Sequence, residues 1–162
     1  VRNMQSDGVH EKTLVLLKPD TVRRGLIGEV THRLEDKGLK LVAAKMITPT
    51  AELWREHYAH VADKPFYPSY EAFMMSAPVV AMVWEGMEAV QVVCAMSGVT
   101  NAREAGPGTI RGDLADSRGC NILHRSDSIE TAPTEIARFF TDNELFDYER
   151  TNEMLYMDDE RT

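Results

Sequence analysis

The sequence has little basic charge. Its 162 residues include 18 Lys and Arg against 26 Asp and Glu, which gives a formal net charge of −8. Because basic side chains on phosphates supply most of the affinity for nucleic acid, this balance argues against a general affinity for DNA or an anionic membrane, but it leaves room for a local basic pocket. Only six of the basic residues are lysines, which suits either ordinary solubility or work in high salt, and the sequence leaves both open.

Cysteine pairs and long apolar runs are also scarce. Cys94 and Cys120 are the only cysteines and form no CxxC pair, which excludes a disulfide framework and a zinc site of that spacing. The longest apolar stretch falls far short of the ~20 residues that span a bilayer, and the N-terminus has no basic-then-apolar signal. We therefore expect no nucleic-acid or membrane partner and a reducing, cytoplasmic setting.

What is present is the composition of one soluble domain. Hydrophobic residues make up 43% of the chain and charged residues 27%, which is enough for a hydrophobic core at this length. We expect a flexible N-terminal arm over 1–11, one globular domain over 12–157 and an acidic C-terminal tail over 158–162.

Apolar periodicity predicts strands that alternate with helices. The expected strands cover 13–17, 39–47, 79–84 and 121–124, and the expected helices cover 27–34, 50–59, 70–75, 86–96 and 131–140. A capping-box-like start at Thr131 opens the last helix. The segment 98–120 carries five of the ten glycines, and loops of that length are usually functional. This order favours a split βαβ sheet with helices on one face.

His124 is a candidate nucleophile because it ends the last predicted strand, directly after the glycine-rich segment. Imidazole attacks a phosphoryl group when one ring nitrogen is free and an acceptor holds the other. Ser126 and Glu135 are the candidate orienting groups nearby in sequence, although spacing alone does not bring Glu135 to the ring. A lone histidine more often has a structural role, and that alternative stays open at this point.

Two cations are candidate anion-binding residues. Lys18 directly follows the first predicted strand, which fixes its charge at the sheet edge, and Arg111 lies in a loop whose glycines allow close backbone approach to an anion. Thr100 and Asn101 add a hydroxyl and an amide, and the aromatics of 65–68 can stack a base. Taken singly, each of these residues is more often structural. The absence of GxxxxGK[ST] and GxGxxG excludes P-loop enzymes and Rossmann proteins.

The sequence resembles the nucleoside diphosphate kinase family over about residues 12 to 157. The resemblance is carried by TLVLLKPDTVRRGLIGEV, KGLKLV, EHYAHVADKPFY, SAPVVAMVWEG, GVTNAREAGPGTIRGD and NILHRSDSIETAPTEIARFF. The combination of KPD at the first strand with HxSDS after PGTIRGD makes it specific. It implies an α+β, ferredoxin-like βαββαβ antiparallel sheet with additional helices.

The resemblance also implies a ping-pong reaction. His124 takes the γ-phosphate of a nucleoside triphosphate such as ATP and passes it to a nucleoside diphosphate. Glu135 matches the acidic residue that orients the histidine, with Ser126 beside it. The nucleotide-binding positions are Lys18, Tyr58, Arg111 and Asn121 for the phosphates and ribose or beside the histidine, Thr100 for a phosphate and Phe66 for the base. Mg²⁺ is the implied cofactor, bridging phosphate oxygens without a direct protein ligand.

Four positions depart from the family pattern. Cys94 stands where the family carries a phosphate-binding arginine, and Arg125 replaces the glycine after the histidine. Ser97 replaces a large aliphatic residue, and Thr21 replaces a glycine. Either the missing arginine weakens activity, at ~1.5–3 kcal/mol for a charge-assisted contact, or Arg125 supplies the charge from a new direction. From the sequence we favour weakened activity, because a side chain adjacent to the nucleophile need not point at the phosphates.

The family assembles as hexamers or tetramers, and we expect a homo-oligomer with the hexamer favoured. Apolar residues near the tail, Leu155, Tyr156 and Met157, could pack on a neighbour. One alternative function is an activity-weakened or inactive nucleotide-binding homologue of the same fold, but the retained histidine and cations argue against complete loss. The other is a nucleic-acid module on a ferredoxin-like sheet, against which the charge of −8 argues.

Overall fold

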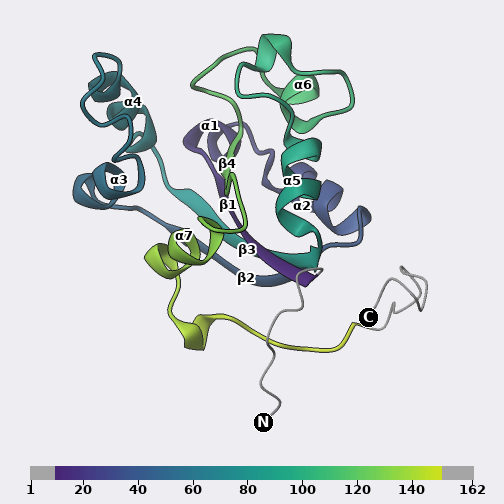
Figure 1. Cartoon of the computed structure of the whole chain (residues 1–162). Coiled ribbons are helices and arrows are strands. Elements are labelled where there is room, and N and C mark those ends of the chain that lie inside the picture. Colours follow the sequence, from purple (N-terminus) through teal and green to yellow (C-terminus); the bar gives the residue numbers. More distant parts are fainter. Residues whose placement is uncertain (1–9, 151–162) are drawn as a thin grey trace.

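Four antiparallel strands form the centre of the protein, whose structure is a computed structural model that describes residues 10–150 (Figure 1). The strands are β1 (His10–Leu17), β2 (Lys40–Ile47), β3 (Val79–Met87) and β4 (Leu123–Arg125). They lie in the order β2-β3-β1-β4, so β4 is an edge strand that pairs with β1. This order is that of the ferredoxin-like βαββαβ fold, and the α+β prediction is confirmed.

Helices cover both faces of this sheet. They are α1 (Pro19–Arg23), α2 (Ile27–Asp36), α3 (Ala51–His57), α4 (Tyr67–Met74), α5 (Ala89–Ser97), α6 (Ile110–Leu114) and α7 (Ala132–Phe139), with 3-10 turns η1 (Ala102–Glu104) and η2 (Asp142–Glu144). Leu14 and Leu16 of β1 pack with α3, α4 and α7, whereas Val15 and Leu17 pack with α2, α5 and α6. The prediction of helices on one face is therefore wrong. Alternate residues of β1 point to opposite faces and all four are fully buried, so both faces need a cover.

β3 is longer than predicted and delays the helix that follows it. Gly86 was expected to open that helix, but it pairs with Glu11 of β1 inside the sheet. The Glu11 carboxylate also accepts the backbone N–H of Val90 at 3.1 Å, which ties the first turn of α5 to β1. β1 itself begins at His10, so the strand includes the last two residues of the arm expected over 1–11.

The glycine-rich segment 98–120 contains α6, which periodicity did not predict. The Thr109 hydroxyl caps this helix by accepting the backbone N–H of Gly112 at 3.0 Å. Glycine is required at 112 because a Cβ there would lie 2.1 Å from the carbonyl oxygen of Gly106. A helix of five residues with an internal glycine carries too little periodicity to be recognised in the sequence.

Two other helices differ from the prediction at their starts. α4 begins at Tyr67, earlier than expected, because Pro68 fits the first turn of a helix. The capping box expected at Thr131 does not form: its hydroxyl donates to the carbonyl oxygen of Ser128 at 3.2 Å. The Glu135 carboxylate, expected in the same box, instead turns towards β4. α7 thus has no side-chain cap at its start, and Glu135 is free to contact a residue of β4.

Among residues 10–150, no helix has both the length and the apolar character needed to cross a membrane. The acidic tail over 158–162 and the apolar group Leu155, Tyr156 and Met157 lie outside the described residues.

Candidate active site

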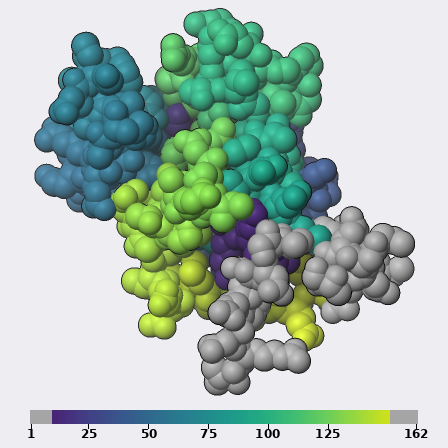
Figure 2. All heavy atoms as spheres, viewed as in Figure 1, coloured from purple at the N-terminus to yellow at the C-terminus, as the bar shows by residue number. Residues whose placement is uncertain are grey.

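His124 lies in the middle of the edge strand β4, opposite Leu16 of β1. Because side chains alternate along a strand, Leu123 enters the core with α2 and α5, and His124 points to the other face, towards α3 and α7. Its side chain is 16% exposed. The α3–α4 segment and the α6 segment rise on opposite sides of β4 (Figure 1), and the surface is hollowed between them (Figure 2).

Glu135 of α7 orients the histidine ring. His124 Nε2 lies 3.1 Å from Glu135 Oε2, and the Ser126 hydroxyl donates to the same oxygen at 3.0 Å. Burial raises the pKa of Glu135, but the hydrogen bond and electrostatic attraction of His124, together with the hydrogen bond of Ser126, outweigh it, so the net pKa lies below the ordinary value. An ionised Glu135 fixes the proton on Nε2, and no group among residues 10–150 hydrogen-bonds Nδ1.

The imidazole of His124 is kept neutral. Burial lowers its pKa, and although the hydrogen bond to Glu135 acts in the opposite direction, the net shift is downward from 6.5. A neutral ring with its proton on Nε2 has an unshared electron pair on Nδ1. That nitrogen is therefore a nucleophile at neutral pH.

α1 fixes the residue that precedes β4. Ile122 has φ of 75°, which is uncommon for a β-branched residue. Its N–H donates to the Asp20 carboxylate at 3.0 Å. Its carbonyl oxygen accepts the Lys18 N–H at 2.9 Å and the Thr21 hydroxyl. Thr21, one of the departures from the family pattern, thus helps to anchor the strand that carries His124. Backbone strain such as the positive φ of Ile122 clusters at functional sites.

Lys18 places a buried ammonium group beside β4. Its Nζ donates to the Asn121 side-chain oxygen and to the Gly119 carbonyl at 3.2 Å, and it lies 5.2 Å from the centre of the Tyr70 ring. Burial, together with the positive charge of Arg111, lowers its pKa to about 7. Within the described residues this ammonium has no carboxylate partner closer than 4 Å, so a bound anion would stabilise its charged form.

Arg111 binds three backbone carbonyls around the same strand. Its Nη2 donates to Leu123 at 2.8 Å and its Nη1 to Gly98 at 2.9 Å. Its Nε donates to Asn121 at 3.2 Å. Burial, together with the positive charge of Arg125, lowers the pKa of Arg111 to about 10. Two buried cations therefore lie next to a nucleophilic ring, an arrangement that favours a polyanionic ligand.

His57 and Tyr58 form an aromatic wall behind His124 at the end of α3. Their ring centroids lie 4.4 and 5.7 Å from that of His124, nearly perpendicular to it. The Tyr58 hydroxyl accepts that of Tyr70 at 3.0 Å. Burial lowers the pKa of His57 to about 3, which keeps it neutral. His57 is not recognisable as a site residue in the sequence, because one buried histidine in an amphipathic helix gives no functional signal.

The remaining candidates lie at the rim or apart from the site. Thr100 is exposed, and its carbonyl oxygen accepts the side-chain amide of Asn121 at 2.8 Å. Phe66 precedes α4 and is 55% exposed. The amide of Asn101 donates instead to Glu104 at 2.7 Å. The structure thus gathers most of the predicted residues around β4, leaves Phe66 on the surface, and does not bring Asn101 into the cluster.

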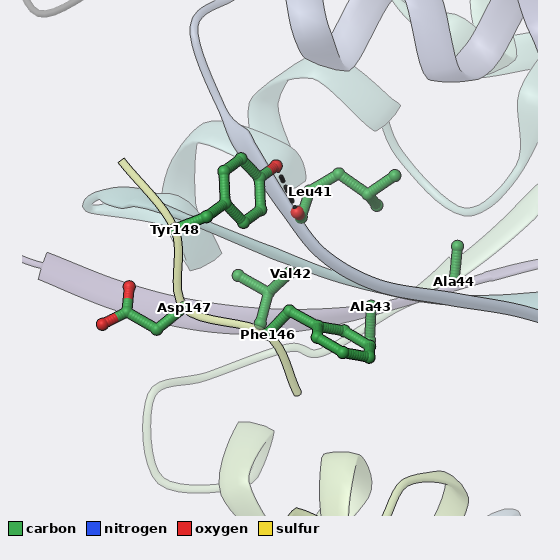
Figure 3. A pocket seen from close by; sticks show the side chains of 7 residues that line it. All are labelled: Leu41, Val42, Ala43, Ala44, Phe146, Asp147 and Tyr148. Atoms are coloured by element: carbon green, nitrogen blue, oxygen red, sulfur yellow. Dashed lines mark hydrogen bonds between the residues drawn. The ribbon is translucent and has the colours of Figure 1, made fainter. Parts of the chain in front are cut away.

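A separate hollow at the opposite edge of the sheet lacks such chemistry. It lies where residues 146–148 pass along residues 41–44 of β2 (Figure 3). Its lining is mostly apolar, and the Tyr148 hydroxyl is already used in a hydrogen bond to the carbonyl oxygen of Leu41 at 2.7 Å. We therefore place the candidate active site at β4.

A histidine that a carboxylate holds through one ring nitrogen, with the other nitrogen free and buried cations beside it, is typical of the active site of a phosphotransferase. Comparisons with known proteins agree with this class. The sequence profile of the nucleoside diphosphate kinase family matches residues 11–145. A nucleoside diphosphate kinase of Parabacteroides distasonis is 53% identical over 151 residues, which are 93% of this chain and 99% of that protein.

Human nucleoside diphosphate kinase 3 is 49% identical over 142 residues, or 88% of this chain and 84% of that protein. The structure of a halophilic nucleoside diphosphate kinase from Halobacterium salinarum in complex with CDP gives a TM-score of 0.85 at 50% identity and covers 87% of this chain and 94% of that one. The chain belongs to the nucleoside diphosphate kinase family and transfers phosphate between nucleotides. The resemblance seen in the sequence is confirmed, and the inactive homologue is not favoured.

Proposed function

We propose that the phosphate passes through Nδ1 of His124. Nδ1 attacks the γ-phosphorus of a nucleoside triphosphate, the N–P bond forms, and the bond to the bridging oxygen breaks to release a nucleoside diphosphate. A second nucleoside diphosphate then attacks the phosphohistidine through its terminal phosphate oxygen and leaves as the triphosphate. The observation that carries this proposal is the contact of Nε2 with Glu135, because it leaves the electron pair on Nδ1.

The buried cations supply electrostatic stabilisation in this proposal. Lys18 and Arg111 neutralise charge on the transferring phosphoryl group, and Asn121 keeps both in position through its side chain and its carbonyl. Tyr58 supports the ring of His124. At the rim, Thr100 contacts a phosphate and the exposed ring of Phe66 stacks on the base, as the family resemblance implies.

Mg²⁺ fits this site as a partner of the nucleotide and not of the protein. Within the described residues, the group best placed to hold a metal ion is His57, His124 and Glu135, whose ligand atoms lie within 4.8 Å of one another. Two imidazoles and one carboxylate do not match the oxygen ligands that Mg²⁺ prefers. The phosphate oxygens of the nucleotide would hold the ion, which reduces their charge when bound.

The assembly and setting form part of the same proposal. We infer a homo-oligomer, with the hexamer favoured over the tetramer, and sedimentation velocity distinguishes the two by mass. A cytoplasmic location accords with the free thiols of Cys94 and Cys120. Neither a nucleic-acid nor a membrane partner is proposed, in keeping with the net charge of −8.

Incubation with ATP labelled on the γ-phosphate tests the central step. We expect an acid-labile, base-stable label on the intact protein, located on the peptide that contains His124, and its release by any nucleoside diphosphate. His124→Ala should carry no label. The control is His32→Ala, which removes an exposed histidine paired with Asp36 on α2 and should be labelled like the parent. An unlabelled parent protein would sink the proposal.

A further inference from the structure

Arg125 is a partly buried cation directly next to His124 with hydrogen-bonding capacity to spare. Its side chain is 16% exposed, and its Nη1 pairs with Asp127, a residue that is itself 80% exposed. Its Nε is buried and has no hydrogen-bond partner among the described residues. A buried guanidinium with an unused donor normally marks a missing partner.

Strand geometry carries Arg125 away from the nucleophile. Because side chains alternate along β4, Leu123 and Arg125 face α5 and His124 faces α7. α5 carries Cys94 on this side, where its Sγ lies 3.7 Å from the carbonyl oxygen of Ser126. The side chain of Arg125 therefore lies on the face covered by α5, the helix that carries Cys94 in place of the family's arginine.

The charge of Arg125 acts on the groups around it. Burial raises the pKa of the Cys94 thiol, and the positive charge of Arg125 opposes this rise. The same charge adds to the burial that lowers the pKa of Arg111. Arg125 thus lies within electrostatic reach of both Cys94 and the buried Arg111. Two guanidinium groups repel each other unless an anion lies between them, and Asp127 is too exposed to provide strong compensation.

We propose that Arg125 contacts the terminal phosphate of the bound nucleoside diphosphate, supplying from β4 the positive charge that the family pattern places at position 94 on α5. This inference deepens the proposed phosphate transfer and rests on it. It reverses the interpretation favoured from the sequence, in which the missing arginine weakens the enzyme. The position of Arg125 makes this contact feasible, because α6, which carries the buried Arg111 of the candidate site, covers the same face of the sheet as α5.

A set of four variants tests the exchange of one arginine for another. Arg125→Gly should lower kcat/KM for a nucleoside diphosphate about 10- to 100-fold, the range for a lost charge-assisted contact. Arg125→Lys should keep part of the activity. Cys94→Arg alone should bring at most a small change, because the site already has its cation. The double variant Cys94→Arg/Arg125→Gly should recover most of what Arg125→Gly loses.

Binding measurements separate a phosphate contact from a structural role. Arg125→Gln keeps the length of the side chain and should lower the affinity for ADP while leaving that for AMP within about twofold, as measured by calorimetry. Arg55→Gln, which removes an exposed arginine paired with Glu71 on α3, is the control and should change neither. Equal losses for ADP and AMP, or none for either, would overturn the proposal.

The two proposals fail in different ways. If the parent forms no phosphohistidine, the proposed phosphate transfer is wrong, whatever Arg125 does. If the parent forms it and Arg125→Gly retains kcat/KM within threefold, only the role of Arg125 is wrong.

Discussion

The residues on the two sides of His124 differ in how their charges are compensated. On one side, which we call the orienting side (His57, Tyr58, Ser126 and Glu135), every charge has a partner: Glu135 is held by His124 and Ser126. On the other, the cationic side (Lys18, Arg111 and Asn121), positive groups bind only uncharged oxygens. The cationic side is therefore destabilised by burial without a counterion, and a phosphate relieves it.

The difference shows where this molecule sacrifices stability for binding. Burial holds the pKa of Lys18 at about 7, far below its ordinary value, whereas the pKa of Glu135 remains on the side that favours its charge. A preorganised cationic site of this kind favours anion binding, because folding has already removed the hydration shells of its cations. On the orienting side, the hydrogen bonds of Glu135 to His124 and Ser126 hold the catalytic ring in place instead.

We expect the largest effect on activity from a substitution on the orienting side. Glu135→Gln should lower kcat/KM by about 10²-fold or more, because a neutral amide holds the Nε2 proton more weakly and has no negative charge to stabilise the positive ring that forms during attack. Steady-state kinetics and the rate of phosphohistidine formation measure it. Glu130→Gln, an exposed change on the same segment, should be neutral. A Glu135→Gln enzyme within threefold of the parent would contradict the role given to this carboxylate.

A smaller effect is expected from Arg111→Lys on the cationic side. One ammonium group cannot span the carbonyls of Gly98, Asn121 and Leu123. We expect kcat/KM to fall about 10- to 50-fold and the free energy of unfolding to fall by about 2 kcal/mol. Urea denaturation and kinetics measure the two. Arg103→Lys, which replaces one exposed contact to the Asp116 carbonyl oxygen, is the control. Equal effects of the two changes would contradict the role given to Arg111 on the cationic side.

The pH dependence of kcat/KM sharpens the comparison further. Lys18 loses its proton above its pKa of about 7 in the free protein, so kcat/KM should fall by up to tenfold per pH unit above that value, and kcat less, because bound phosphate raises the pKa. Lys18→Arg should abolish the slope. A flat profile in the parent protein between pH 7 and about 9 would contradict the assignment.

The same pKa makes a prediction about stability with the opposite sign. The folded pKa lies below the ordinary value of 10.5, so the unfolded chain binds more protons between about pH 7 and 10.5. The contribution of Lys18 to stability therefore rises with pH in that window. Thermal unfolding of the parent and of Lys18→Met at several pH values isolates this contribution, because the variant should lack it.

The smallest expected effect lies outside both sides. Phe66→Leu removes an exposed ring at the start of α4 and should raise KM about threefold to tenfold for purine nucleotides without changing kcat. The free energy of unfolding should stay within about 0.5 kcal/mol of the parent, because the side chain packs little. A change in kcat would contradict a role of Phe66 in binding alone and would show that its ring affects the residues of the orienting side.

Some of the site was readable from the chain. The strand before Lys18 and the strand that carries His124 were both predicted within a few residues, because apolar runs bounded by proline or glycine give a clear signal. The contact of His124 with Glu135, eleven residues apart, was only suggested, since it depends on the turn between β4 and α7. His57 and α6 were missed, as neither produces a periodic pattern.

The sequence alone determined the family, the order of the strands along the chain and the types of chemical group at the site, because these depend on local apolar patterns and on motifs. Tertiary structure decided how those groups behave. Lys18 and Asn121 are 103 residues apart, and only folding buries the lysine and shifts its pKa. Folding also turned Arg125 towards Cys94. Burial and charge proximity are collective properties, and no stretch of sequence contains them.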